Sequence, residues 1–138
     1  MITIRKQEIV KLEDVLHLYQ AVGWTNYTHQ PEMLEQALSH SLVIYLALDG
    51  DAVVGLIRLV GDGFSSVFVQ DLIVLPSYQR QGIGSSLMKQ ALKDYKDTYQ
   101  VQLVTDQTER TLGFYRSMGF EILSTYNCIG MTWVNREK

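Results

Sequence analysis

The hydrophobic pattern of the chain changes period once, near Pro76, and this change limits the folds that the sequence can adopt. Before it, residues 64–75 form a long run rich in Val, Ile and Phe, which is typical of a buried strand. After it, apolar residues recur at helical spacing from Ile83 to about Lys96. A short apolar segment at 101–104 predicts another strand. Because a strand, a crossover helix and a second strand pair in parallel, we expect the two strands to lie side by side.

The other elements indicate an α/β chain with a mixed, mostly antiparallel sheet flanked by helices. Asp49-Gly50 predicts a two-residue turn, Asp106 is expected to cap the last helix, and residues 23–30 should form a loop. No linker or repeat interrupts the chain, so we expect one domain over 1–138. We expect strands at 2–5, 42–48, 51–60 and in a closing hairpin at 120–123 and 129–134, and helices at 12–22, 31–38 and 106–118.

Composition and charge exclude several classes of protein. The 138 residues are 46% apolar and 20% charged, which is typical of a globular protein. No apolar run approaches the roughly 20 residues of a membrane helix, and the N-terminus lacks the order of a signal peptide. We therefore expect a cytoplasmic protein without a membrane partner. The net charge of −3 argues against a nucleic-acid partner, and the histidines and the single Cys128 show no metal-ligand spacing.

A glycine-rich loop lies between the long strand and the helix that follows it. The first amides of a helix have no internal acceptor and point outward at the positive end of the helix dipole, which makes them an anion site. Glycines let the backbone approach an anion, and Arg80 adds a fixed positive charge. The loop suits a phosphate or pyrophosphate, although a tight turn without a ligand explains the glycines equally well. Its residues are Gln79, Arg80, Gln81, Gly82, Ile83, Gly84 and Ser85.

Two segments resemble signatures of one enzyme family. Residues 71–84, with the sequence Asp-Leu-Ile-Val-Leu-Pro-Ser-Tyr-Gln-Arg-Gln-Gly-Ile-Gly, resemble motif A of the GNAT superfamily of N-acetyltransferases, whose core is Gln/Arg-x-x-Gly-x-Gly/Ala after a strand. Residues 114–120, Phe-Tyr-Arg-Ser-Met-Gly-Phe, resemble its second signature, a tyrosine four residues before Gly-Phe. One helix and one strand separate the two segments, as in the family. The order of elements matches along nearly the whole chain, and the resemblance implies that the loop binds the pyrophosphate of acetyl-CoA.

The resemblance also implies a place for the rest of the cofactor. In the family, the two parallel strands splay apart at one end and form the CoA cleft. The pantetheine arm pairs there with strand backbone, here Leu72, Ile73 and Val74, next to a bulge expected near Asp71–Leu72. By resemblance, the amide of Ile73 polarises the thioester carbonyl.

Two side chains are candidates for acid–base catalysis when an amine attacks the acetyl carbon directly. Tyr115 matches the family's proposed general acid for the leaving thiolate, or it could only pack beside the cofactor with Phe114. Asp71 could take a proton from the amine, directly or through water, or could cap backbone donors at the bulge. Thr108 stands where many relatives have an asparagine near the cofactor, and its hydroxyl can still donate one hydrogen bond.

The acceptor side is less defined by the sequence. In this fold, the first two helices and the loop between them wall the acceptor site. Trp24 and Tyr27 could line a pocket or stack on a cation, or they could cap the core. Asp62 could attract an ammonium group or serve only its own turn. The sequence does not identify the amine acceptor, and it leaves a homodimer open.

Three functions from different classes follow from these residues. The leading one is an N-acetyltransferase that moves an acetyl group from acetyl-CoA to a primary amine of a small molecule or a peptide. The alternative is a non-catalytic sensor or interaction module that binds acyl-CoA, which needs Arg80, Gly82 and Gly84 but not Tyr115. The third is a structural domain without a CoA site.

Overall fold

The computed structural model describes residues 1–137, and these fall into two compact units. The first unit is Met1–Leu103, and the second comprises the residues from Val104 onward. Each unit is described by itself. The expected single domain over 1–138 stays a prediction.

The first unit is built on a mixed sheet whose strands follow the order of the sequence. Neighbouring strands pair antiparallel, except for the last pair, β4 and β5, which is parallel and thus confirms the expected crossover. Within residues 1–137 the sheet has five strands. They are β1 (Ile2–Gln7), β2 (Val43–Asp49), β3 (Ala52–Gly61), β4 (Ser66–Val74) and β5 (Gln100–Leu103).

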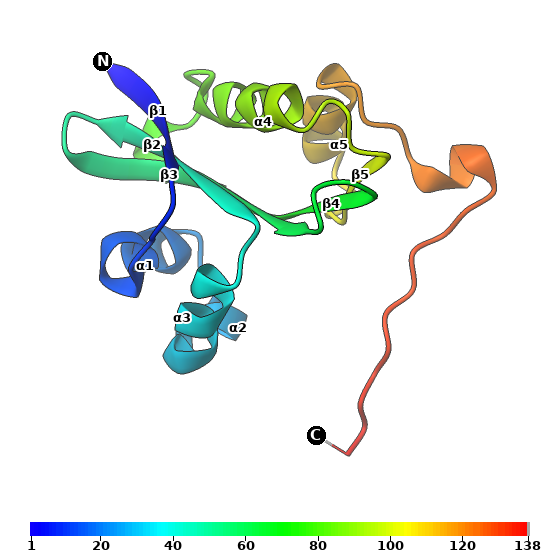
Figure 1. The fold of residues 1–138 in the computed structure, drawn as a ribbon, viewed down its shortest axis with the longest axis horizontal. Helices are drawn as coiled ribbons and strands as arrows, with labels where there is room; N and C mark the ends of the chain where they lie inside the picture. The colour runs from blue at the N-terminus through cyan, green and yellow to red at the C-terminus, as the bar shows by residue number, and fades with distance from the viewer. Residues whose placement is uncertain (138) are drawn as a thin grey trace. The chain divides into compact units, whose positions relative to one another are not determined.

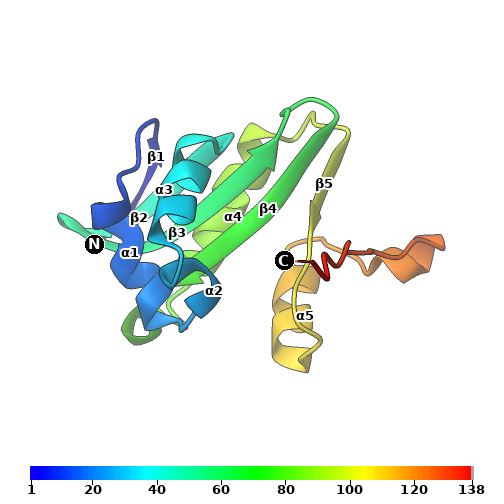
Figure 2. The ribbon, with the colours of Figure 1, turned by 90° about the horizontal axis from the view of Figure 1, so that it is seen from below.

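Helices cover both faces of this sheet. Figures 1 and 2 show α1, α2 and α3 on one face and α4 on the other. Gly23, at φ +71°, follows the first helix, and Pro31 begins the third, where its missing amide hydrogen has no helical acceptor in any case. The bounds are α1 (Leu12–Ala21), α2 (Thr25–Thr28), α3 (Pro31–Ser39) and α4 (Ile83–Asp94), and the second unit contains α5 (Glu109–Ser117).

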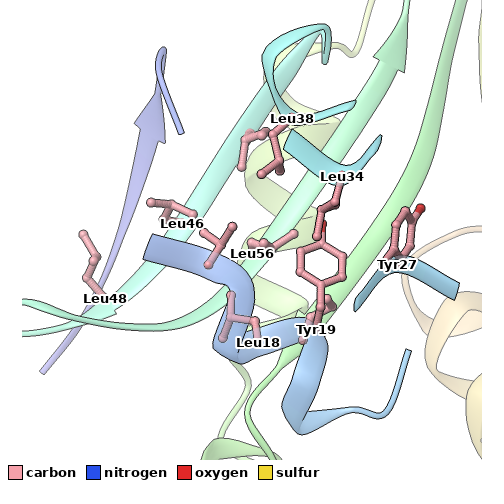
Figure 3. Packing of buried hydrophobic residues seen from close by; sticks show 11 residues of the cluster. Leu18, Tyr19, Tyr27, Leu34, Leu38, Leu46, Leu48 and Leu56 are labelled. Atoms are coloured by element: carbon pink, nitrogen blue, oxygen red, sulfur yellow. The ribbon is translucent and has the colours of Figure 1, made fainter. Parts of the chain in front are cut away.

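The core of the first unit lies between the sheet and the three N-terminal helices. Figure 3 shows leucines from α1 and α3 against leucines of β2 and β3, with Tyr19 and Tyr27 beside them. Leu18, Leu34 and Leu56 are fully buried, and each such side chain contributes about 1.5–3 kcal/mol of burial free energy. The helices and the middle of the sheet are therefore held together mainly by apolar packing.

Two local expectations in this unit need correction. Asp49 pairs with Ala52, so the turn residues are Gly50 and Asp51 rather than Asp49 and Gly50. Only Gly50 of the two has a positive φ (+61°), which explains why the glycine leads the turn. The expected loop at 23–30 contains the short helix α2, whose buried Tyr27 packs into the core.

The second unit departs further from the sequence-based expectation. Thr108, not Asp106, caps α5, because its hydroxyl accepts the amide of Thr111 (3.3 Å). Asp106 accepts the amide and the hydroxyl of Thr108 instead.

The expected closing hairpin at 120–123 and 129–134 is wrong. The structure has a 3-10 helix, η2 (Leu123–Tyr126), and no strand among the described residues 127–137. The alternating side chains Ile129, Met131 and Trp133 are 82–93% exposed. A two-stranded ribbon without a buried face is marginal in water, so the alternating pattern alone does not produce a hairpin.

Candidate functional site

The loop between β4 and α4 has an unusual backbone. It begins with a 3-10 turn, η1 (Pro76–Tyr78), and then passes through two left-handed residues, Arg80 at φ +66° and Gly82 at φ +80°. A Cβ placed on Gly82 would meet nothing within 4 Å, so the left-handed backbone, not space within the chain, favours glycine there. Arg80 adopts the same region with a full side chain, which costs free energy and is more frequent at functional sites.

The N-terminus of α4 is ready to accept an anion. The first helical hydrogen bond runs from the amide of Ser86 to the carbonyl of Gly82 (3.0 Å), so the amides of residues 83–85 have no helical acceptor. Within the described part of the chain, no side chain caps this end and no acidic residue occupies the first turn. The exposed Arg80 lies in the same loop. These groups together form a positive terminus suited to a phosphate.

Gln79 and Gln81 differ in what they do in this loop. The side-chain amide of Gln79 donates to the carbonyl of Val74 (3.1 Å), so it ties the loop to the end of β4. Gln81 is exposed, and Ile83 is buried under the first turn of the helix. The structure therefore brings the predicted loop residues together at the end of β4, with Gln79 acting as an internal anchor.

β4 contains a one-residue bulge at Gln70. Leu59 pairs with Val69, whereas the adjacent Arg58 pairs with Asp71, so Gln70 has no partner in β3. The sequence predicts a bulge near Asp71–Leu72, and the structure places it just before these residues, at Gln70. Because side chains alternate along a strand, the extra residue reverses which face each later residue of β4 occupies.

Beyond the bulge, one edge of β4 carries no strand within the described pairing. The parallel ladder with β5 runs from Ser66–Gln100 to Val69–Leu103 and ends there. The other edge still pairs with β3 as far as Val74. The pairing with β5 thus stops where the bulge begins.

The register decides which amides point to this open edge. The amide of Leu75 donates to the carbonyl of Val54 in β3 (2.9 Å). Backbone groups of successive residues alternate between the two edges of a strand, so the amide of Ile73 also faces β3. The amides of Leu72 and Val74 face the open edge. The geometry thus favours Leu72 over Ile73 as the donor to a ligand along this edge.

Asp71 sits in a buried polar cluster behind the bulge. Its carboxylate is 2% exposed and accepts the Nε of Arg58 at 2.7 Å. It also accepts the hydroxyls of Tyr19 (2.8 Å) and Tyr27 (2.9 Å). Burial, and then the charge of Asp71, raise the pKa of the Tyr19 phenol, which therefore donates as a neutral group.

These contacts bear on both roles considered for Asp71. Its partners are side chains rather than backbone donors of the bulge, and both of its oxygens are occupied. Because hydrogen bonds from Arg58, Tyr19 and Tyr27 already fill these two buried oxygens, the geometry disfavours Asp71 as a general base. Sequence reasoning missed Arg58 and Tyr19. A charged residue within the apolar run 52–60 was the available signal for Arg58, because a buried charge needs a partner.

The predicted acceptor residues form an aromatic cluster in the core. The ring of Tyr27 lies 5.1 Å from that of Tyr19, and Trp24 lies 6.1 Å from Tyr19. Tyr27 is 9% exposed and its hydroxyl is engaged by Asp71, while Trp24 packs against the same core. These contacts favour the core role of both side chains, and their role toward an acceptor stays a prediction.

Asp62 acts within its own turn. Its carboxylate accepts the amides of Phe64, Ser65 and Ser66 at 2.7–3.2 Å and also the hydroxyl of Ser65. The Ser65 hydroxyl and these amides lower the pKa of the Asp62 carboxyl well below its ordinary value. These hydrogen bonds within the turn explain why an aspartate stands at position 62.

The second unit holds the other group of predicted site residues. Tyr115 stands edge-to-face with Phe114 and Phe120, at centroid distances of 5.1 and 5.9 Å. Burial, and secondly the charge of Asp106, raise the pKa of the Tyr115 phenol, so it carries its proton at neutral pH. The hydroxyl of Thr108 donates to the carboxylate of Asp106 and accepts the amide of Thr111 at the start of α5. Tyr115 thus has the protonation state that a general acid requires.

Two further searches of residues 1–137 gave negative results. No helix there is long and apolar enough to span a bilayer. In the same residues, no group of three or more His, Cys, Asp and Glu side chains is arranged to hold a metal ion.

In this chain a strand with an open edge leads through a left-handed loop to an uncapped helix N-terminus, an arrangement suited to a phosphate-bearing ligand. Residues 40–122 match the acetyltransferase (GNAT) domain family. The chain therefore belongs to the GNAT family of acetyltransferases, as the two sequence signatures indicated.

Individual proteins agree with this assignment. A GNAT-family acetyltransferase from Streptococcus pneumoniae TIGR4 has a solved structure that is 84% identical, with a TM-score of 0.91 over 99% of both chains. The rice (Oryza sativa subsp. japonica) protein serotonin N-acetyltransferase 2, chloroplastic, is 33% identical over 66% of this chain. The chain spans 48% of the length of that relative. The PaiA N-acetyltransferase of Thermoplasma acidophilum, solved with coenzyme A, shares the fold (20% identity over 87% of this chain and 91% of that one, TM-score 0.67).

Proposed function

We propose that the protein is an acetyl-CoA-dependent N-acetyltransferase that acts on a primary amine. The observation that carries this proposal is the open edge of β4 running into the loop at 79–85. The edge presents unused amides, and the loop presents three more at a positive helix terminus. A ligand with an extended amide-bearing arm and a pyrophosphate fits that sequence of groups, and CoA is such a ligand.

The loop binds the pyrophosphate in this proposal. The amides of Ile83, Gly84 and Ser85 donate to its oxygens, and the exposed Arg80 supplies a positive charge. The bound coenzyme A in the Thermoplasma relative of the same fold supports the choice of ligand. Gln79 contributes indirectly, because it anchors the loop to Val74.

The pantetheine arm extends along β4 as an added strand would. Val74 is nearer the loop and pairs with the arm, while Leu72 is nearer the bulge and reaches the thioester end. The amide of Leu72 then donates to the thioester carbonyl and stabilises the oxyanion that forms during attack. This amide is fixed by strand geometry, so it needs no reorganisation during the reaction.

The reaction forms a C–N bond and breaks a C–S bond. The neutral amine attacks the acetyl carbon, the carbonyl oxygen takes up negative charge, and the CoA thiolate leaves. The thiolate takes up a proton, for which the family resemblance proposes Tyr115 as the donor; the nitrogen loses a proton to water, and the donor regains one from solvent. Asp71 takes no proton, because its carboxylate is held by Arg58 and two tyrosines. Much of the acceleration comes from holding the two reactants together.

The experiment uses the 138-residue chain with acetyl-CoA and a panel of amines, including serotonin because the rice relative is named for it. Released CoA thiol is followed with a thiol reagent, and acetyl-CoA binding is measured by calorimetry. Turnover with at least one amine supports the proposal. Binding without turnover across the panel favours a non-catalytic acyl-CoA sensor, and no binding overturns both.

Proline substitutions separate the roles of the two edge amides. Leu72→Pro and Val74→Pro each remove one amide hydrogen from the open edge, and neither removes a hydrogen bond to β3. We expect Leu72→Pro to lower kcat by roughly 100-fold, as loss of an oxyanion donor does. Val74→Pro should mainly weaken acetyl-CoA binding. Equal effects of both variants on kcat would contradict the assignment of Leu72.

A further inference from the structure

The cluster of Arg58, Asp71, Tyr19 and Tyr27 is joined to the bulge of β4. Arg58 and Asp71 are the first cross-strand pair after the extra residue Gln70. Tyr19 comes from α1 and Tyr27 from α2, and both donate to the same carboxylate. Side chains that lie 13–52 residues from Asp71 in the sequence thus converge on one carboxylate beside the bulge.

The contacts of this cluster distinguish one register of β4 from the next. If the bulge disappeared, the pairing of Leu59 with Val69 would continue, so Gln70 would oppose Arg58 and Asp71 would oppose Ile57. Ile57 shares its face with Gly55, whose position lies against Leu87 of α4. The Asp71 carboxylate would then face an apolar layer without a cation, and Arg58 would lose its anion.

In the observed register, all four members of the cluster have hydrogen-bond partners for their buried polar groups. Arg58 is 4% exposed and also donates to the hydroxyls of Ser41 and Tyr27 (both 3.2 Å). No buried side-chain nitrogen or oxygen among the described residues lacks a hydrogen-bond partner. A fully satisfied buried network of this kind is rigid and tolerates little displacement.

We propose that Arg58, Asp71, Tyr19 and Tyr27 are positioning residues that hold the Gln70 bulge and so aim the amide of Leu72 at the acyl group. The inference rests on the proposed acetyl transfer. The side chain of Gln70 reaches the hydroxyl of Tyr27 (3.4 Å), so the bulge residue itself is linked to the cluster. Tyr27 therefore fixes the bulge from the helical side, and Arg58 fixes it from β3.

Two variants with the same chemical change test the proposal. Tyr19→Phe removes one hydroxyl that donates to a carboxylate in the cluster. Tyr45→Phe, the control, removes the hydroxyl of a buried tyrosine in β2 that donates to Asp94 at the end of α4, away from the cluster. We expect Tyr19→Phe to lower kcat at least about tenfold while the Kd for CoA stays within twofold, because small misplacements at a reaction centre cost rate. Tyr45→Phe should leave kcat unchanged.

A second readout reports the bulge directly. Amide chemical shifts and hydrogen exchange of residues 70–72 should change in Tyr19→Phe and Asp71→Asn and stay as in the wild type in Tyr45→Phe. Equal kcat values for the two tyrosine variants, or unchanged amides at 70–72, would overturn the positioning role. If the wild type transfers no acetyl group, the proposed function fails, and the amide measurements alone then decide whether the cluster holds the bulge.

Discussion

Removing the carboxylate of Asp71 should cost this protein much of its stability. Asp71→Ala leaves Arg58 buried without its anion, and breaking a buried ion pair from one side typically costs about 3–5 kcal/mol. Arg58 keeps three weaker contacts, to Tyr27, Ser41 and the carbonyl of Ala37, which favours the lower part of that range.

The two tyrosines add to this cost. The hydroxyls of Tyr19 and Tyr27 lose their acceptor, and an unsatisfied buried donor costs about 1–3 kcal/mol. Tyr27 is 9% exposed whereas Tyr19 is fully buried, so Tyr19 carries most of this penalty. We expect a total loss of about 4 kcal/mol in the free energy of unfolding. For a chain of this length, that lowers the melting temperature by about 12 °C.

Urea unfolding followed by far-UV circular dichroism measures this loss. The control is Asp94→Ala, which removes another carboxylate that accepts a tyrosine hydroxyl, but one that is exposed to solvent. Its cost should be about 1 kcal/mol or less, because water replaces the lost partner. Equal losses for Asp71→Ala and Asp94→Ala would refute the reasoning.

Replacement of the whole cluster separates the cost of an unpaired charge from the value of the pair. Arg58→Met, Asp71→Leu, Tyr19→Phe and Tyr27→Phe together leave no buried polar group unmatched. Apolar replacements of buried ion pairs are often neutral or stabilising by about 1–4 kcal/mol, so the fourfold variant should be at least as stable as the wild type. A fourfold variant as unstable as Asp71→Ala would show that the penalty has another origin.

Three further outcomes are expected. Arg80→Ala should weaken acetyl-CoA binding about tenfold in calorimetry with an unchanged melting temperature, because the side chain is exposed and loses only a charged contact; a Kd equal to that of the wild type would remove Arg80 from the site. Tyr115→Phe should lower kcat at least about 100-fold with unchanged CoA affinity, and normal turnover would exclude it as the acid. Because burial and Asp71 raise the pKa of Tyr19 above the ordinary value of about 10, its contribution to stability is complete below pH 10 and declines as the pH rises toward the folded-state pKa. Urea midpoints should therefore fall more steeply above pH 10 in the wild type than in Tyr19→Phe.

The sequence predicted the frame of the first unit well because its signals are local. The run at 64–75, the glycines of the loop and the helical spacing after Ile83 each depend on near neighbours, and the parallel pairing follows from their order. The hairpin expected near the C-terminus failed for the opposite reason. An alternating pattern becomes a strand only when a partner strand and a buried face are present, and neither is a property of the segment itself.

In the candidate site, too, the features with local sequence signals could be predicted and those that depend on long-range contacts could not. The loop at 79–85 was readable from glycine and arginine positions alone. The partners of Asp71 were not, because Tyr19, Tyr27 and Arg58 lie 13–52 residues away and meet only after the helices pack on the sheet. The choice between the amides of Leu72 and Ile73 depends on the exact register with β3, which a one-residue bulge shifts.

The bulge at Gln70 also makes the length of β4 a fixed quantity. Deleting this one residue would rotate everything after it by half a turn of the strand, so Asp71 and Ile73 would leave the side of the three N-terminal helices for the side of α4. Inserting one residue at this point would likewise exchange the two faces for all later residues of β4. The turn between β3 and β4, at 62–65, lies before the bulge and outside this constraint. Proteins that share this site should therefore vary in the length of that turn while keeping a constant count of residues from the bulge to the loop at 79–85.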